Sequence, residues 1–135
     1  QSHATSNACS IAQYATITAL GSPEECVEAM VARFAERRAA AIARIGKMKD
    51  AYCIVPDGAF YIMLVVSGAF GKKLGERTIA NAADFADALL EEKKVAVVPG
   101  GPFGADDCVR LSYSLSMEDM MEGLERIDAF LTQLK

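Results

Sequence analysis

An α+β domain is the fold class that this sequence predicts, with a long linking helix that leads into a small sheet flanked by helices. Three observations predict it. Residues 22–46 repeat apolar side chains at helical spacing, residues 51–66 and 95–114 are rich in β-branched and aromatic side chains, and residues 116–131 return to helical spacing. A chain of 135 residues is long enough for one domain with a buried core.

A short helix is expected close to the start of the chain. Ser6 and Asn7 are residue types that cap helix N-termini, and Gly21 is a residue type that ends helices. Between them, apolar residues recur at steps of three, which favours a helix with one apolar side. The residues of that side are Ile11, Tyr14, Ile17 and Leu20.

A second and longer helix should begin at the sequence SPEE. Ser22 supplies an N-cap hydroxyl, Pro23 suits the first helical position, and Glu25 stands where a capping box places its glutamate. We expect this helix to reach Gly46, which makes it about 24 residues and about 36 Å long and suits it to join two structural units. Its apolar stripe comprises Val27, Met30, Val31, Phe34, Ala41, Ile42 and Ile45.

The next segments predict strands and a further helix. AYCIV and AFYIMLVV flank the turn signal PDG in residues 51–66, which indicates a strand or hairpin pair. The glycines and basic residues of 67–81 are typical of a mobile surface loop. Residues 82–94 should form a helix, with Phe85, Leu89 and Leu90 facing inward.

The stretch VAVVPGGPFGADDCVRLSYS, residues 95–114, indicates a strand, a Gly/Pro turn and a second strand. In CVRLSYS apolar and more polar residues alternate, which places Arg110 on the more polar face of its strand. Gly100, Gly101 and Gly104 are interpreted as a turn rather than a phosphate cradle, because they match no phosphate-binding motif. Ser116 with Asp119 then predicts the cap of a last helix. The apolar stripe of that helix is Met120, Leu124, Ile127, Phe130 and Leu131.

Arg110 is the candidate binding residue. Its planar guanidinium can bind a carboxylate with two parallel hydrogen bonds, which a lysine cannot reproduce. The pattern alone favours the simpler interpretation of a surface arginine on the wet face of a sheet. Other candidates are also interpreted as solvated, because none has a partner at motif spacing and a catalytic lysine needs burial or a close cation. These are His3 and the pairs Lys72/Lys73, Lys93/Lys94 and Arg37/Arg38.

Composition excludes several classes. The net charge is −4 with 24% charged residues, so no basic footprint for nucleic acid is expected. The longest apolar run, residues 59–66, is too short to span a membrane. No signal peptide is recognised, so a cytoplasmic location is expected, and Gln1 suggests a piece of a longer chain. The cysteines lack CxxC spacing, which favours reduced structural thiols and no metal site. They are Cys9, Cys26, Cys53 and Cys108.

Several ordered motifs resemble one enzyme family. QSHATSNACSIAQYATITAL and SPEECVEAMVARFAERR resemble the stretch that follows the cofactor-binding lysine in class I aminotransferases of the aspartate aminotransferase family. PDGAFY, LLEEKKVAVVPGGPFG, VRLSYS and EGLERIDAFL resemble the small domain of the same enzymes. The resemblance implies fold type I, a homodimer, and pyridoxal 5′-phosphate in the parent enzyme. It also implies that residues 1–46 end the large domain with the linking helix and that residues 47–135 form the small C-terminal domain.

The resemblance assigns one site residue. The arginine of the VRLSY motif, which matches Arg110, binds the substrate α-carboxylate in that family. Phe60 and Tyr61 of the GAFY motif lie near the domain cleft in such enzymes, and no definite role is assigned to them. No catalytic, cofactor-binding or metal-binding residue is assigned in this chain.

The family's cofactor-binding residues lie upstream of the motifs matched here. None of the lysines in this chain stands in the S-x-x-[ST]-K context of the cofactor lysine, so the chain alone is expected neither to bind the cofactor covalently nor to transaminate. It is also expected to self-associate through apolar helix faces. Two functions stay open: part of an aspartate-type aminotransferase, or a non-catalytic effector-binding or dimerisation domain of an aminotransferase-like transcription regulator. Arg110 reads only the α-carboxylate, so side-chain specificity is not predicted.

Overall fold

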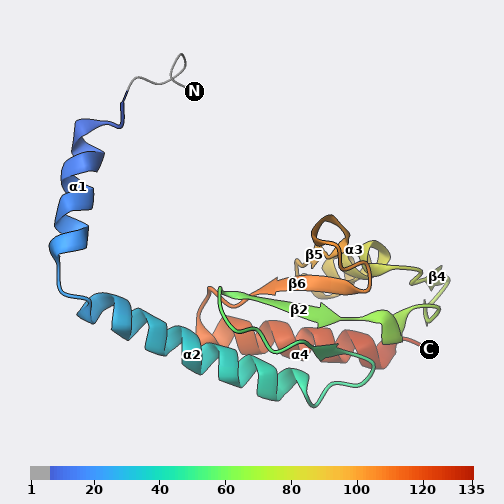
Figure 1. The fold of residues 1–135 in the computed structure, drawn as a ribbon. Helices are drawn as coiled ribbons and strands as arrows, with labels where there is room; N and C mark the ends of the chain where they lie inside the picture. The colour runs from blue at the N-terminus through green and yellow to red at the C-terminus, as the bar shows by residue number, and fades with distance from the viewer. Residues whose placement is uncertain (1–6) are drawn as a thin grey trace. The chain divides into compact units, whose positions relative to one another are not determined.

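The computed structural model describes residues 7–135 (Figure 1). The chain divides into two compact units, Gln1–Ala32 and Arg33–Lys135, which are described separately. No helix of the described residues is both long enough and apolar enough to cross a membrane. The domain boundary expected between residues 46 and 47 concerns a larger protein and stays a prediction.

The first unit contains helix α1 (Ser10–Gly21), as the sequence predicts. Its N-cap is Cys9, which gives no side-chain hydrogen bond, so the expected cap at Asn7 is wrong, and Ser6 lies outside the described residues. The chain is not yet helical at Asn7 and Ala8, and the first helical backbone bond runs from Gln13 N to the Cys9 carbonyl. The apolar side of α1 is exposed throughout, at Ile11, Tyr14, Ile17 and Leu20.

Helix α2 (Glu25–Ile45) begins later than the sequence predicts. The Ser22 hydroxyl donates a hydrogen bond to the Thr18 carbonyl at 2.6 Å, so it serves the end of α1 and not the start of α2. The expected capping box is therefore wrong. Glu25 and Glu28 in the first turn still favour this helix start, because carboxylates interact well with a helix N-terminus.

A four-stranded antiparallel sheet forms one layer of the second unit, in the order β1-β2-β6-β5 (Figure 1). Its central strands pair in a register that sets Met63 opposite Arg110 and Val109 opposite Leu64. The predicted hairpin pair is confirmed, whereas the strand expected at 95–98 joins the ladder only at its last residue. The strands are β1 (Tyr52–Cys53), β2 (Tyr61–Val65), β5 (Val98–Pro99) and β6 (Cys108–Ser112).

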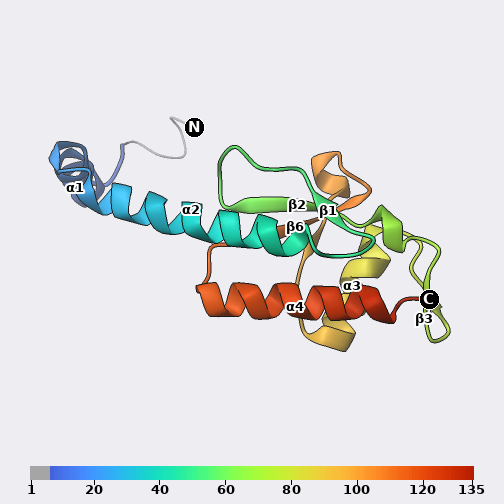
Figure 2. The same cartoon turned by 90° about the horizontal axis from the view of Figure 1, so that it is seen from below.

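The core of this unit lies between the sheet and the helices α3 (Ala82–Lys93), α4 (Met117–Gln133) and the second half of α2. Figures 1 and 2 both show α4 beside that half of α2. Phe85 and Phe130 meet edge to face, with ring centroids 5.2 Å apart. The predicted stripe of α4 is buried at every position, and its Ser116 cap is confirmed by a 3.0 Å hydrogen bond from Asp119 N.

One predicted detail of the helices is wrong. Leu90 of α3 is 48% exposed, because the buried side of that helix follows Phe85, Ala86 and Leu89 around the helix axis. In α2, Val27, Met30 and Val31 are exposed, which agrees with the expected apolar helix faces, and full burial occurs only in the second half of the helix, at Ala41 and Ile45.

Residues 67–81 form an ordered hairpin and not the expected loop. The 3-10 turn η1 (Ser67–Ala69) leads into β3 (Lys73–Leu74) and β4 (Arg77–Thr78), which pair antiparallel. Gly71 and Gly75 have φ of 84° and 60°, so these glycines make turns. The hairpin is held by ion pairs of 2.6 Å between Lys72 and Asp50 and of 2.7 Å between Arg77 and Glu91. Lys72 is half-buried, so its interpretation as a solvated side chain is wrong.

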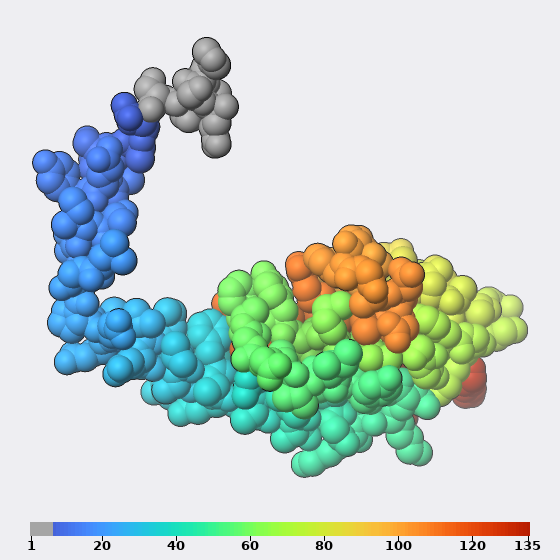
Figure 3. All heavy atoms as spheres, in the orientation of Figure 1, coloured from blue at the N-terminus to red at the C-terminus, as the bar shows by residue number. Residues whose placement is uncertain are grey.

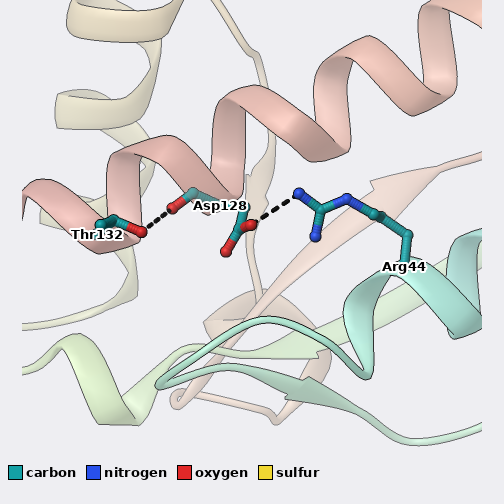
Figure 4. A network of polar contacts seen from close by, with 3 residues as sticks. All are labelled: Arg44, Asp128 and Thr132. Carbon is teal, nitrogen blue, oxygen red and sulfur yellow. Dashed lines mark hydrogen bonds and ion pairs between the residues drawn. The ribbon is translucent and has the colours of Figure 1, made fainter.

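One ion pair joins α2 to α4 across the second unit. Arg44 Nη2 donates to Asp128 Oδ2 at 2.7 Å, and the Thr132 hydroxyl donates to the Asp128 carbonyl at 2.9 Å (Figure 4). The side chains of Arg44 and Asp128 are 18% and 31% exposed. Partial burial makes such a pair more stabilising than an exposed one.

Candidate functional site

Arg110 lies in the middle of β6, on the face of the sheet opposite the helical core. Its neighbour Val109 is fully buried in that core, while Arg110 itself is half-buried. The alternation predicted for this strand is therefore confirmed. Met63 of β2 and Val98 of β5 are its direct partners across the two ladders. Residues that pair directly share a face of the sheet, so these two side chains flank the arginine.

Two aromatic rings lie against the guanidinium. The Arg110 Cζ is 4.4 Å from the Tyr61 ring centroid and 4.3 Å from the Phe103 ring centroid. The Cζ atom of Arg110 lies over both rings, which come from two different segments of the chain. Both distances are well within the range of cation–π attraction. The guanidinium is thus held by two aromatic contacts.

The Arg110 guanidinium makes no hydrogen bond or ion pair with protein atoms in residues 7–135. Most other arginines do: Arg33, Arg44, Arg77 and Arg126 pair with carboxylates, and Arg38 donates to a carbonyl. Arg37 resembles Arg110 in lacking a polar partner, with its Cζ 5.3 Å from the Phe34 ring. A half-buried, unpaired arginine that is held by rings can bind an anion from solution.

The turn between β5 and β6 places Phe103 beside Arg110. It contains the 3-10 turn η2 (Gly101–Phe103), and its atoms form the orange surface of the second unit in Figure 3. A Cβ at Gly100 would lie 2.2 Å from the Ala105 carbonyl oxygen, and Gly104 has φ of 74°. Both positions therefore require glycine. The interpretation of this segment as a turn is confirmed.

Two backbone N–H groups of the same turn are not available to a phosphate group. Gly100 N donates to the Cys108 carbonyl at 2.8 Å, and Gly104 N donates to the Gly101 carbonyl at 2.9 Å. A phosphate cradle needs free backbone N–H groups, and these are committed within the turn. Two of the described lysines are committed as well: Lys72 pairs with Asp50, and Lys94 donates to the Glu91 carbonyl at 2.7 Å. These four groups are therefore already engaged by protein acceptors.

The loop before β2 supports Tyr61 from the other side. The Arg38 guanidinium donates to the Pro56 carbonyl at 2.8 Å, and the Phe60 ring centroid lies 4.4 Å from that of Tyr61 and 6.3 Å from that of Phe34. Arg38 is half-buried. Its interpretation as part of a solvated helix side is therefore wrong. His3, the remaining candidate from the sequence, lies outside the described residues.

Cys108 begins the strand that carries Arg110. Burial raises the pKa of its thiol from 9.0 to about 11, with a further contribution from the Asp107 carboxylate beside it. Burial also raises the pKa of Cys53. All four cysteines are free thiols, and Cys9 and Cys26 are exposed. A neutral buried thiol at Cys108 is a packing group and not a nucleophile.

Sequence reasoning found Arg110 and missed the partners that shape its site. Phe103 lies within the quoted motif VAVVPGGPFG, and Tyr61 lies within PDGAFY, to which no role was assigned. The signal that could have found Tyr61 is its strand position. It pairs with Ser112, two residues from Arg110 on the same face. Phe103 gave no such signal, because its position depends on the turn.

The fold and this site define an α+β domain with one half-buried arginine that has no polar partner within residues 7–135, and comparison with known proteins gives its family. The family model "Aminotransferase class I and II" matches residues 1–127. The chain is 42% identical over 135 residues to the aspartate/prephenate aminotransferase of Cereibacter sphaeroides, covering 99% of this chain and 34% of that protein. It is 43% identical over 130 residues to the aspartate aminotransferase of Geobacillus stearothermophilus, covering 96% of this chain and 32% of that protein.

Solved structures agree with the family match. The aspartate aminotransferase of Rhizobium meliloti superposes with a TM-score of 0.94 at 36% identity, over 99% of this chain and 34% of that one. The aspartate aminotransferase of Thermotoga maritima gives 0.79 at 37% identity, over 97% of this chain and 31% of that one. The chain belongs to the class I and II aminotransferase family, with the α+β fold of the small C-terminal domain. It spans about a third of the length of the curated relatives it matches.

Proposed function

We propose that this chain is part of a pyridoxal-phosphate-dependent aminotransferase of the aspartate type, to which it contributes Arg110 as the residue that binds the substrate α-carboxylate. The observation that carries the proposal is the half-buried residue Arg110, whose guanidinium contacts two aromatic rings and which no protein acceptor in residues 7–135 engages. The family match supports the transaminase class.

In this role Arg110 binds and orients the substrate. Two parallel N–H···O bonds to a carboxylate fix both the position and the plane of that group. The rest of the amino acid is then held in one orientation, which contributes to catalysis by removing rotational freedom before the reaction. Pyridoxal phosphate, when bound elsewhere in the protein, would supply the electron-withdrawing ring that the reaction requires. Domain closure on substrate would bring Arg110 toward it.

The proposed substrate pair follows from the group that Arg110 would bind, the α-carboxylate. An amino acid and a 2-oxo acid share the carboxylate, so one arginine serves both halves of an amino-group transfer. The side chain of the substrate is not read by Arg110. The relatives named above are aspartate and aspartate/prephenate aminotransferases, which makes aspartate the first amino donor to test. They also favour an enzyme over a transcription regulator, which we do not propose.

The remaining features of the proposal concern the assembly. Residues 1–46 would end the large domain, and residues 47–135 would form the small domain of a cytoplasmic homodimer. The apolar side of α1 is exposed and supports an interface between this helix and further protein. Its residues are Ile11, Tyr14, Ile17 and Leu20. Such a continuous apolar side on a described helix fits contact with further protein. The isolated chain is expected to self-associate for the same reason.

The proposal is tested with the full-length protein that carries these residues. Supplied with pyridoxal phosphate, it should transfer the amino group of aspartate to a 2-oxo acid, and omission of the cofactor should abolish turnover. The chain of 135 residues is the matched control. When this shorter chain is mixed with pyridoxal phosphate and treated with borohydride, no single lysine should become labelled. A folded, cofactor-saturated full-length protein that transfers no amino group from any amino acid would overturn the proposal.

A further inference from the structure

Tyr61 and Phe103 are residues whose role the proposed function leaves open. Tyr61 begins β2 and Phe103 ends the turn η2, so two segments far apart in the sequence meet at one guanidinium. We propose that Tyr61 and Phe103 are positioning residues that hold Arg110 with its N–H edge toward the substrate carboxylate. This inference rests on the proposed function and adds to it the two residues that set the direction of approach.

The physical argument starts from the length of an arginine side chain. An unrestrained arginine loses much rotamer freedom when it binds a ligand, and that loss weakens binding. Rings at 4.4 Å and 4.3 Å from Cζ restrict the guanidinium before any ligand arrives. On this proposal the two rings cover the faces of the guanidinium. A ligand then reaches Arg110 only in the plane of its N–H groups, which is the geometry that a carboxylate matches.

The placement of Phe103 supports a role other than core packing. Its side chain is 50% exposed, so burial of the ring is not what fixes its position. The turn that carries it is tightly constrained at Gly100, where a Cβ would be 2.2 Å from a carbonyl oxygen. Tyr61 is supported in turn by Phe60, with ring centroids 4.4 Å apart. The backbone of the turn that carries Phe103 and the ring of Tyr61 thus each have support other than Arg110.

The kinetic test uses the full-length protein with Phe103→Leu and Tyr61→Leu, which remove one ring each. The KM for both the amino acid and the 2-oxo acid should rise about 3- to 30-fold per lost ring, while kcat changes much less. Phe103→Tyr and Tyr61→Phe keep the rings and should restore the wild-type KM. Tyr52→Leu is the matched control. Tyr52 pairs with Val65 on the same face of the sheet and is 61% exposed.

A second readout does not depend on activity. In the chain of 135 residues, the Tyr61 and Phe103 rings should shield the Arg110 Nε–H proton, because the guanidinium lies over both rings. Either Leu variant should move that NMR resonance downfield. This inference alone would be overturned if both Leu variants kept the wild-type KM and the wild-type Nε–H resonance while Arg110→Lys raised the KM. An Arg110→Lys enzyme with unchanged KM would overturn the proposed function and this inference together.

Discussion

The hydroxyl of Tyr113 donates a hydrogen bond of 2.7 Å to the carbonyl oxygen of Ala59. The two residues lie 54 positions apart in the chain. Tyr113 follows β6 and is buried, whereas Ala59 belongs to the loop before β2 and has φ of 58°. A second bond runs from Tyr113 N to the Phe60 carbonyl at 3.0 Å. These bonds tie the end of the Arg110 strand to the loop that leads into Tyr61.

Replacing Tyr113 by phenylalanine should therefore weaken the fold without removing the ring. We expect Tyr113→Phe to lower the free energy of unfolding by about 1 kcal/mol, measured by urea denaturation of the chain. Tyr52→Phe is the control, because Tyr52 is exposed and its hydroxyl makes no hydrogen bond within residues 7–135. Equal denaturation midpoints for Tyr113→Phe and the wild type would show that this bond adds nothing to stability.

Two glycines should respond to the same substitution with opposite signs. Gly100→Ala forces a Cβ to within 2.2 Å of the Ala105 carbonyl oxygen and should cost about 1 to 3 kcal/mol. Gly123→Ala places a Cβ in open space within α4 and should stabilise by about 0.5 to 1 kcal/mol, because alanine favours helices. Thermal melts of the two variants and the wild type check this pair. A Gly100→Ala melt at or above the wild-type temperature would contradict the constraint on the turn.

Cys108 should make the stability of the chain fall in alkaline solution. Its pKa is about 11 in the fold and 9.0 ordinarily, so the unfolded chain loses this proton first as the pH rises. The contribution of the protonated Cys108 thiol to the free energy of unfolding is fully present below pH 9. It is lost between pH 9 and 11, by roughly 1.4 kcal/mol per pH unit. Urea denaturation of the wild type and Cys108→Ala across this range measures the difference. Parallel pH profiles for the two proteins would count against a buried thiol.

Local sequence patterns predicted the elements that depend on local chemistry. The Ser116 cap and the stripe of α4 were predicted correctly, because capping and helical spacing act within a few residues. The alternation of β6 correctly placed Arg110 away from the core. Capping failed at Ser22, where one hydroxyl could serve either of two helices and bonded back to Thr18.

The rest of the site depends on contacts between distant segments, which spacing does not encode. Phe103 reaches Arg110 only because the β5–β6 turn folds over the sheet, and Tyr61 does so only through the register of β2 against β6. The hairpin in residues 67–81 was missed for a related reason. The glycines of this segment suggested a flexible loop. The hairpin is ordered by contacts with distant residues, such as the ion pair between Lys72 and Asp50.

The kcat/KM of an Arg110→Lys variant of the full-length protein tests the central claim most directly. Lysine keeps the charge and removes the bidentate fork, so kcat/KM should fall by about 100-fold or more for the amino acid and the 2-oxo acid alike, with cofactor absorbance unchanged. Arg37→Lys is the control, since Arg37 also lacks a polar partner within residues 7–135 but lies on α2. An Arg110→Lys enzyme with kcat/KM within about threefold of the wild type would contradict the assignment of Arg110 as the carboxylate-binding residue.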